Sequence, residues 1–248
     1  MGSMFTLFLY LSLGSIAGLL GGLLLIWKEK TAKNLSLHLI SFAAGVILAT
    51  AFLDLLPEAI EAGGEGTFVL ILIGLVAFFL VEDFWLHFHH HEEHRHSLAS
   101  VVPLLVTSDS IHNFIDGVAI TASFLADPQL GLIVALATFF HEIPQEIGDF
   151  GVMIISGVKK SKVILYNLFS ALSTFIGAIV TIVLAGRSEN LVGPLLGLAT
   201  GMFLYISSAD ILPQLVHGER RDIRWHTAGF FLAGITLVYL LTRIVPGH

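Results

Sequence analysis

The sequence predicts an all-α polytopic membrane protein with eight transmembrane helices, on two observations. First, 55% of its 248 residues are hydrophobic and only 12% are charged, a composition that a soluble domain of this size cannot hide in its core. Second, apolar runs of about 20 residues, the length that crosses roughly 30 Å of hydrocarbon, recur along the chain. The connections between the runs are short, so we expect a single transmembrane domain over residues 1–248.

Each predicted span ends where charged or turn-forming residues begin. In chain order the spans cover residues 4–27, 37–60, 67–87, 97–125, 129–158, 163–185, 191–216 and 226–245. The first and seventh spans carry glycines at three- and four-residue spacing, which lets helix backbones approach closely. The second and seventh each contain a proline beside acidic or amide residues, and the fourth and fifth hold most of the buried polar side chains.

Basic residues predict the orientation of the spans, because positively charged short loops stay in the cytoplasm. Of the 12 Lys and Arg residues, only Arg187 and Arg243 do not follow the first, third, fifth or seventh span. With an even number of spans, this bias places both termini outside. We therefore expect a multi-pass protein of the cell membrane with both termini extracytoplasmic.

A short internal similarity predicts an inverted repeat. Residues 54–58 (DLLPE) in the second span are echoed by residues 210–214 (DILPQ) in the seventh. Spans that lie five apart cross the membrane in opposite directions, as an inverted-topology repeat requires. We therefore expect spans one to three to match spans six to eight around a central pair, a 3+2+3 arrangement.

The central pair of spans carries two polar motifs, HNFIDG at residues 112–117 and HEIPQEIGD at residues 141–149. Residues four apart on a helix share a face, so His112 and Asp116 project side by side, with Asn113 next to them. An imidazole and a carboxylate one turn apart can grip one divalent ion.

The fifth span has five polar side chains on two adjacent stripes about 100° apart. They are His141, Gln145 and Asp149 on one stripe, and Glu142 and Glu146 on the other. Pro144 has no N–H, so the carbonyl of Phe140 is left to face water, another side chain or a cation. Kinked helices of this kind are where membrane transporters hold ions.

The charges of these two spans favour a metal ion over hydrogen bonding between helices alone. Ionisable groups in hydrocarbon are costly unless something pairs with them. The two spans carry two imidazoles and, counting Asp109, five carboxylates, yet no Lys or Arg occurs between residues 97 and 158. The chain also has no cysteine, so nitrogen and oxygen atoms must hold the metal.

Two other readings of the same residues stay open. The metalloprotease signature His-Glu-x-x-His is incomplete here, because the second His is replaced by Gln145 and Pro144 interrupts the turn. An intramembrane zinc-dependent hydrolase also needs an open coordination position and an activated water, which makes it the weaker alternative. The other is a metal-selective channel, in which these residues line a multi-ion pore.

The paired motifs at residues 112–117 and 141–149 resemble those of the ZIP (Zrt/Irt-like) divalent metal transporters, in particular the branch that includes the LIV-1 subfamily. The resemblance covers essentially the whole chain, and it implies a two-metal centre in the transport path. The implied ligands are His112, Asp116, Glu142 and Gln145 for the main site, and Asn113, His141 and the shared Glu142 for its neighbour. Glu146 and Asp149 match the pattern as further candidate ligands. LIV-1 members typically have His where this chain has Gln145, and an amide oxygen is a weaker, harder ligand than imidazole, so strict zinc selectivity is not implied.

Residues 87–96 form a predicted cytoplasmic loop with six histidines. Imidazoles at this density bind zinc or other borderline metals, so we expect the loop to receive or sense released metal, the alternative being a solvated loop with adventitious affinity. Asp54, Glu58 and Asp210 are expected to line the access route or to hydrogen-bond neighbouring helices.

Together these features predict an importer of Zn²⁺, with Fe²⁺, Mn²⁺ and Cd²⁺ as further candidates, that works by alternating access and is not an enzyme. The resemblance implies that spans one, four, five and six move against spans two, three, seven and eight. The expected partners are divalent metal ions and membrane lipid, without nucleic acid, and a homodimer is allowed. The metal is the transported substrate, and no organic cofactor is expected.

Overall fold

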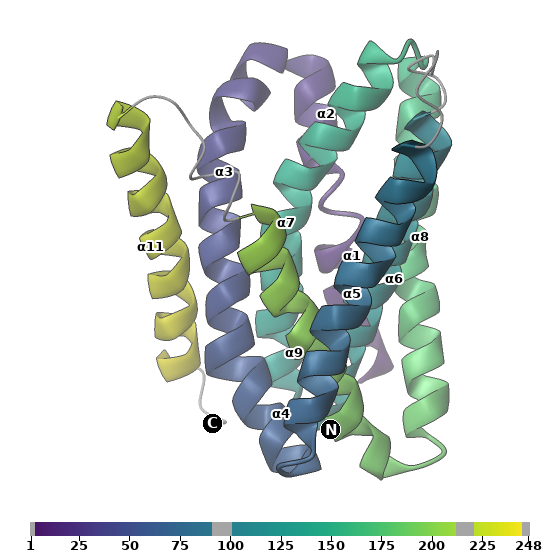
Figure 1. Ribbon diagram of the computed structural model, residues 1–248, viewed down its shortest axis with the longest axis vertical. Helices are drawn as coiled ribbons and strands as arrows, with labels where there is room; N and C mark the ends of the chain where they lie inside the picture. Colours follow the sequence, from purple (N-terminus) through teal and green to yellow (C-terminus); the bar gives the residue numbers. More distant parts are fainter. Residues whose placement is uncertain (1–2, 91–100, 212–220, 245–248) are drawn as a thin grey trace.

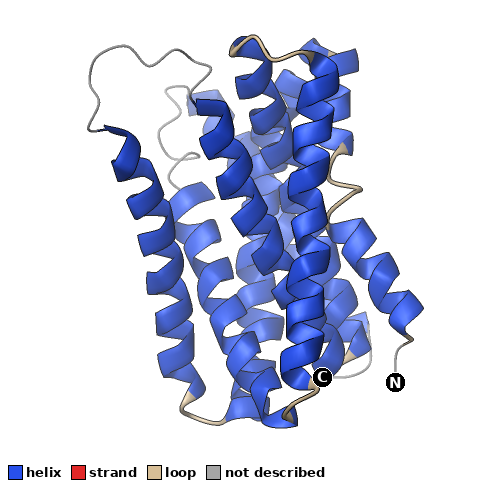
Figure 2. Ribbon diagram, turned by 90° about the vertical axis from the view of Figure 1, so that its right-hand side faces the viewer, coloured by secondary structure: helices blue, strands red, loops and turns tan. Residues whose placement is uncertain are grey.

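The computed structural model describes residues 3–90, 101–211 and 221–244. Every regular element in these ranges is helical, and the longer helices lie side by side along the long axis of the molecule (Figure 2). The predicted all-α class is therefore confirmed. Five helical segments are long and apolar enough to cross a membrane, as expected for a polytopic membrane protein. They are Glu29–Gly63, Pro128–Ile155, Lys160–Ala185, Val192–Ala209 and Trp225–Ile244.

The helices are labelled along the chain in Figure 1. The α-helices are α1 (Met4–Gly14), α2 (Leu20–Trp27), α3 (Glu29–Thr50), α4 (Leu56–Gly63), α5 (Thr67–His90), α6 (Val101–Ala126), α7 (Pro128–Ile155), α8 (Lys160–Ala185), α9 (Val192–Tyr205) and α11 (Arg221–Ile244). A 3-10 turn, η3 (Glu189–Leu191), precedes α9. Two π-helical turns, η1 (Ala51–Leu55) and η4 (Ile206–Ile211), follow α3 and α9.

Two segments differ from the sequence-based expectation. The first predicted span is not one helix, because a turn at residues 15–19 separates α1 from α2. The Ser15 hydroxyl donates to the carbonyl of Ala171 on α8 at 2.7 Å, a contact that holds the turn against its neighbour. The second difference concerns the loop predicted at residues 87–96. Helix α5 continues to His90, because residues 82–90 contain no glycine or proline that would break it. The rest of that segment, residues 91–96, lies outside the described residues.

Helix α7 lies at the centre of the bundle and packs against α1, α2, α3 and α6 (Figure 1). The buried apolar side chains form two clusters, one at each end of α6 and α7. Ala119 and Ala137 belong to the first cluster, whereas Val102 and Ile147 belong to the second. The polar residues predicted to bind metal, except Asp149, fall between these positions on both helices, so they interrupt the apolar core near its middle.

Three helix pairs meet through reciprocal glycines that bring backbone against backbone. A Cβ atom added at Gly117 on α6 would lie 1.9 Å from the carbonyl oxygen of Thr174, and one added at Gly177 on α8 would lie 1.9 Å from that of Phe114. The other two pairs are α3 with α11, through Gly45 and Gly234, and α5 with α9, through Gly74 and Gly201. Such close approach leaves these pairs little freedom to slide.

Candidate metal centre

Four ionisable side chains from α6 and α7 converge in the middle of the bundle. His112 and Asp116 come from successive turns of α6, and His141 and Glu142 are adjacent on α7. We call these four side chains the cage. All four residues are buried, and the most accessible side chain, that of His112, is only 11% exposed.

The four ligand atoms of the cage lie within 4.8 Å of one another, close enough that they could hold one metal ion. His141 Nε2 lies 3.1 Å from His112 Nε2 and 3.2 Å from Asp116 Oδ2. His112 Nε2 lies 3.6 Å from Asp116 Oδ2 and 3.5 Å from Glu142 Oε1, and His141 Nε2 lies 3.6 Å from Glu142 Oε1. Tetrahedral zinc with bonds of about 2.0–2.2 Å separates its ligand atoms by roughly 3.3–3.6 Å. The five measured separations lie within or close to that range.

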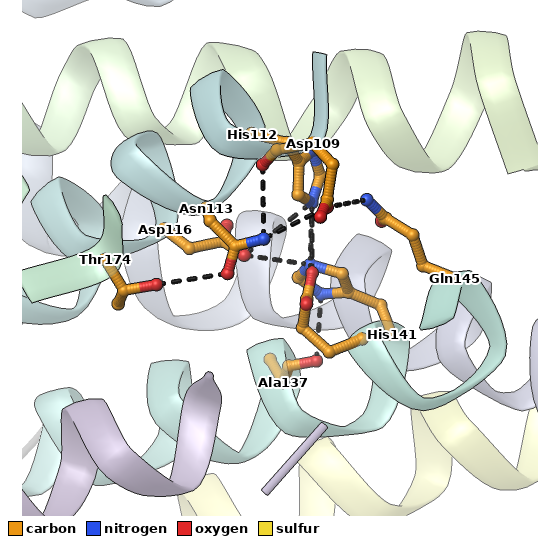
Figure 3. Close-up of polar contacts among 9 residues, drawn as sticks. Asp109, His112, Asn113, Asp116, Ala137, His141, Gln145 and Thr174 are labelled. Carbon is orange, nitrogen blue, oxygen red and sulfur yellow. Dashed lines mark hydrogen bonds and ion pairs between the residues drawn. The ribbon is translucent and has the colours of Figure 1, made fainter. Parts of the chain in front are cut away.

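A backbone contact sets the hydrogen position on His141. Its Nδ1 atom lies 3.1 Å from the carbonyl oxygen of Ala137, one turn earlier on α7 (Figure 3). A carbonyl oxygen only accepts, so Nδ1 carries the hydrogen and the Nε2 lone pair faces the cage. Metal-binding histidines are commonly oriented in this way by a backbone carbonyl.

The cage carboxylates lack the donors that buried oxygens need. Asp116 Oδ1 and both oxygens of Glu142 are buried and have no hydrogen-bond partner among the described residues. The sequence places no Lys or Arg on α6 or α7. Buried charges are stable only when paired, and a divalent cation would neutralise both carboxylates at once. Two imidazoles and two carboxylates also suit zinc and other divalent transition metals.

The two amides of the predicted ligand set face elsewhere in this structure. Gln145 Nε2 donates to Asp109 Oδ1 at 3.2 Å, and Asn113 Nδ2 donates to the same oxygen at 3.0 Å. Asn113 Oδ1 accepts from Thr174 Oγ1 at 3.1 Å. In this arrangement both amides hydrogen-bond to Asp109, and the side chain that lies next to His112 Nε2 is His141, at 3.1 Å.

The remaining predicted ligands lie outside the cage. Glu146 is buried, with both carboxylate oxygens lacking a hydrogen-bond partner among the described residues, and Asp149 is partly buried. Neither belongs to the group whose ligand atoms converge. The structure adds Asp109, which the motif did not include. Asp109 lies four residues before Asn113, and residues four apart on a helix share a face. This spacing is the sequence signal that could have linked Asp109 to the site.

Aromatic rings from other helices cover the two imidazoles. The ring centroid of Phe78 on α5 lies 6.1 Å from that of His112, and the centroid of Phe203 on α9 lies 6.2 Å from that of His141.

Of the acids outside the central pair, Asp54 is buried and accepts from Thr242 Oγ1 at 2.9 Å, whereas the side chain of Asp210 lies outside the described residues.

The fold and the site thus define a class of protein: all-helical in its described part, with membrane-length apolar helices around a buried group of imidazoles and carboxylates that could hold a metal ion. More specifically, the chain belongs to the ZIP zinc transporter family, whose profile matches residues 1–103 and 89–242. This confirms the resemblance that the two motifs predicted.

Several zinc transporters are similar to part of this chain. It is 34% identical over 135 residues to zinc transporter ZIP10 of Danio rerio, a match that covers 54% of this chain and 16% of the relative. It is 32% identical over 151 residues to zinc transporter ZIP6 of Homo sapiens, covering 60% of this chain and 20% of the relative. It is 38% identical over 149 residues to zinc transporter ZIP4 of Homo sapiens, a match that covers 57% of this chain and 22% of the relative. The chain thus matches less than a quarter of the length of these relatives.

Proposed function

We propose that this protein moves Zn²⁺ across the membrane into the cytoplasm and holds the ion in the cage during transport. The observation that carries the proposal is the spacing of four buried ligand atoms on α6 and α7, with five measured separations of 3.1–3.6 Å. Membership of the ZIP zinc transporter family and similarity to proteins named zinc transporters support the same cargo.

The ligand chemistry favours zinc over the abundant hard cations. Mg²⁺ and Ca²⁺ take six or more oxygen ligands, whereas zinc takes four from nitrogen and oxygen. The cage supplies two imidazole nitrogens and two carboxylates. Fe²⁺, Mn²⁺ and Cd²⁺ are the competitors to test, because imidazole also suits other transition metals. Gln145, held by Asp109, acts on selectivity only through its effect on the cage.

The proposal includes eight spans arranged as an inverted repeat. In this assignment α1 and α2 together form the first span, and α3 with α4 forms the second. Two observations support the repeat. The two matching motifs both overlap a π-helical turn, Ala51–Leu55 in one copy and Ile206–Ile211 in the other. The packing of α3 on α11 is mirrored by that of α9 on α5, as exchange of the two halves requires.

Alternating access is supported by where the glycine contacts lie. We call α1, α2, α6, α7 and α8 the carrier bundle, and α3, α4, α5, α9 and α11 the frame bundle. Among the described residues, each glycine whose added Cβ would come within 3.0 Å of another helix meets a helix of its own bundle. Gly21 is an example, because its Cβ would lie 2.1 Å from the carbonyl oxygen of Ile143 on α7.

The two bundles meet instead through side chains, many of them aromatic. Phe42 of the frame bundle and Phe140 of the carrier bundle have ring centroids 5.1 Å apart, and Phe78 and Phe203 face the cage histidines. Side-chain interfaces repack more readily than backbone contacts, so the carrier bundle can shift as a unit with its ion. Inward movement through 100 mV of inside-negative potential releases about 4.6 kcal/mol for a divalent ion, twice the value for one charge.

Uptake of Zn²⁺ by proteoliposomes that contain a zinc-sensitive dye tests the proposal. His112→Ala and His141→Ala each remove one nitrogen ligand and should lower uptake by roughly tenfold or more. His226→Ala is the matched control, because His226 is exposed on α11 and should transport normally. Native uptake by both cage variants would refute the site, and flux that does not saturate with zinc concentration would favour a channel.

A further inference from the structure

Asp109 connects the two helices that build the cage, although it is not a cage ligand. It lies on α6, three residues before His112, and is only 4% exposed. Its Oδ1 atom accepts hydrogen bonds from Gln145 on α7 at 3.2 Å and from Asn113 on α6 at 3.0 Å (Figure 3). One carboxylate oxygen thus ties both amides together, one helical turn away from the cage.

The Asn113 side chain is fixed on both sides. Its Nδ2 atom also donates to the backbone carbonyl of Asp109 at 3.1 Å, and its oxygen accepts from Thr174 on α8 at 3.1 Å. Asn113 is fully buried, so its amide has no freedom to rotate without losing these bonds. The chain of contacts from Thr174 through Asn113 and Asp109 to Gln145 therefore joins α8, α6 and α7.

This link addresses a problem that the cage itself creates. When no ion is bound, Asp116 and Glu142 place like charges close together, and those charges repel in a medium of low dielectric constant. Unless one carboxylate takes up a proton, this repulsion opposes the close approach of α6 and α7. The contact of Asp109 with Gln145 lies one turn along both helices from the contact of His112 with His141. Two contacts on one antiparallel pair fix its register and its rotation.

We propose that Asp109 is a positioning residue: by accepting hydrogen bonds from Gln145 and Asn113, it holds α6 and α7 in the register that gives the cage its metal spacing. This inference rests on the proposed function, because it assigns a role relative to the same ion. It also gives Gln145 a role, since the amide donates a hydrogen bond to Asp109 instead of binding the metal.

The competing explanation is that Asp109 acts through its negative charge, either as a ligand or by attracting the cation. Asp109→Asn separates the two explanations, because asparagine keeps an oxygen acceptor at the same place and loses the charge. Asp109→Ala removes both. A positioning role predicts that Asn substitutes for Asp and Ala does not, whereas a charge-based role predicts that both variants fail alike.

The experiment is a titration of the purified full chain in detergent with Co²⁺, read from the visible absorption of the bound ion, followed by competition with Zn²⁺. Asp109→Ala should weaken affinity roughly tenfold, the factor that about 1.4 kcal/mol represents, and should alter the tetrahedral cobalt spectrum. Asp109→Asn should stay within about threefold of the native chain, since its oxygen still accepts both bonds. The double variant Asp109→Ala, Gln145→Ala should be no weaker than Asp109→Ala alone, because both changes break one link.

Two controls make each outcome decisive. Asp127→Ala removes the carboxylate that caps the start of α7, and it should lower thermal stability while leaving the cobalt spectrum and affinity unchanged. His112→Ala tests the cage itself. If native and His112→Ala chains bind Co²⁺ alike, the proposed site fails. If binding depends on His112 but Asp109→Ala matches the native chain, or Asp109→Asn is as weak as Asp109→Ala, the positioning role is overturned.

Discussion

Substituting Gly18 by alanine should disturb the cage from a neighbouring helix. Gly18 lies in the turn between α1 and α2, against α7. A Cβ atom added there would lie 2.6 Å from the Cβ of Glu142 and 3.0 Å from the carbonyl oxygen of Ser15. Non-bonded carbon atoms pack at about 3.5–4.0 Å, so the turn that holds Gly18 and helix α7 must separate by roughly 1 Å. The Glu142 Cβ is fixed to the backbone and cannot swing away, so the whole residue must move.

The expected size of the effect follows from that displacement. Metal–ligand distances tolerate about 0.2 Å, so a shift of about 1 Å moves the Glu142 carboxylate out of range unless α7 deforms. Overpacking of a buried contact costs about 1–3 kcal/mol, and 1.4 kcal/mol corresponds to about tenfold in affinity. We therefore expect Gly18→Ala to weaken zinc binding about tenfold and to reduce uptake at low zinc concentration.

The assay is Co²⁺ titration with Zn²⁺ competition, together with proteoliposome uptake and a thermal unfolding curve. Gly148→Ala is the matched control, because Gly148 lies on α7 and a Cβ added there would meet nothing within 4 Å. Alanine is favoured over glycine in a helix by about 1 kcal/mol, so this variant should bind zinc normally and be at least as stable as the native chain. A Gly18→Ala chain with native affinity, uptake and unfolding temperature would refute the reasoning.

Three further predictions concern movement, protons and stability. The chain has no cysteine of its own, so introduced cysteines can be cross-linked selectively. Cross-linking Phe42→Cys to Phe140→Cys with a short bismaleimide should stop uptake, because it ties the two bundles together. Cross-linking Phe8→Cys to Phe175→Cys, which replaces a ring pair within the carrier bundle, should leave uptake unchanged. Zinc affinity should fall from about pH 7.5 to about pH 5.5, because protons compete with the metal for imidazole and carboxylate ligands; equal affinity by titration at both values would contradict this. Zinc at 100 times its Kd should stabilise the native chain by about 2.7 kcal/mol in thermal unfolding, and stabilisation of His112→Ala to the same extent would place the ion elsewhere.

The sequence was sufficient for the features that depend on composition and local spacing. Long apolar runs predicted a helical membrane protein, and the four-residue spacing of His112 and Asp116 predicted that they share a face of one helix. The structure has helices that are long and apolar enough to cross a membrane, and it places His112 and Asp116 in one group of ligand atoms. The break in the first span was not predicted, because it involves Ser15 and a carbonyl 156 residues later in the chain, a contact that no local pattern contains.

The membership of the cage also depends on tertiary structure. His141 and Gln145 lie on the same stripe of α7, one turn apart, so their spacing alone does not tell which of them meets His112. The position of α7 along α6 determines which of them does, and in this structure Gln145 donates to Asp109 on α6. A motif therefore names the candidate ligands, whereas the relative positions of the helices determine which of their side chains converge.

The close spacing of four buried ligand atoms in the cage has a kinetic consequence for the proposed transport. A cation held by four such ligands would bind tightly and leave slowly. With association at about 10⁸ M⁻¹s⁻¹, a nanomolar Kd gives an escape rate of about 0.1 per second. Faster turnover requires α6 and α7 to part, or protons to replace the cation, during each cycle. The pair of helices that captures the ion would therefore also determine the pace of its delivery.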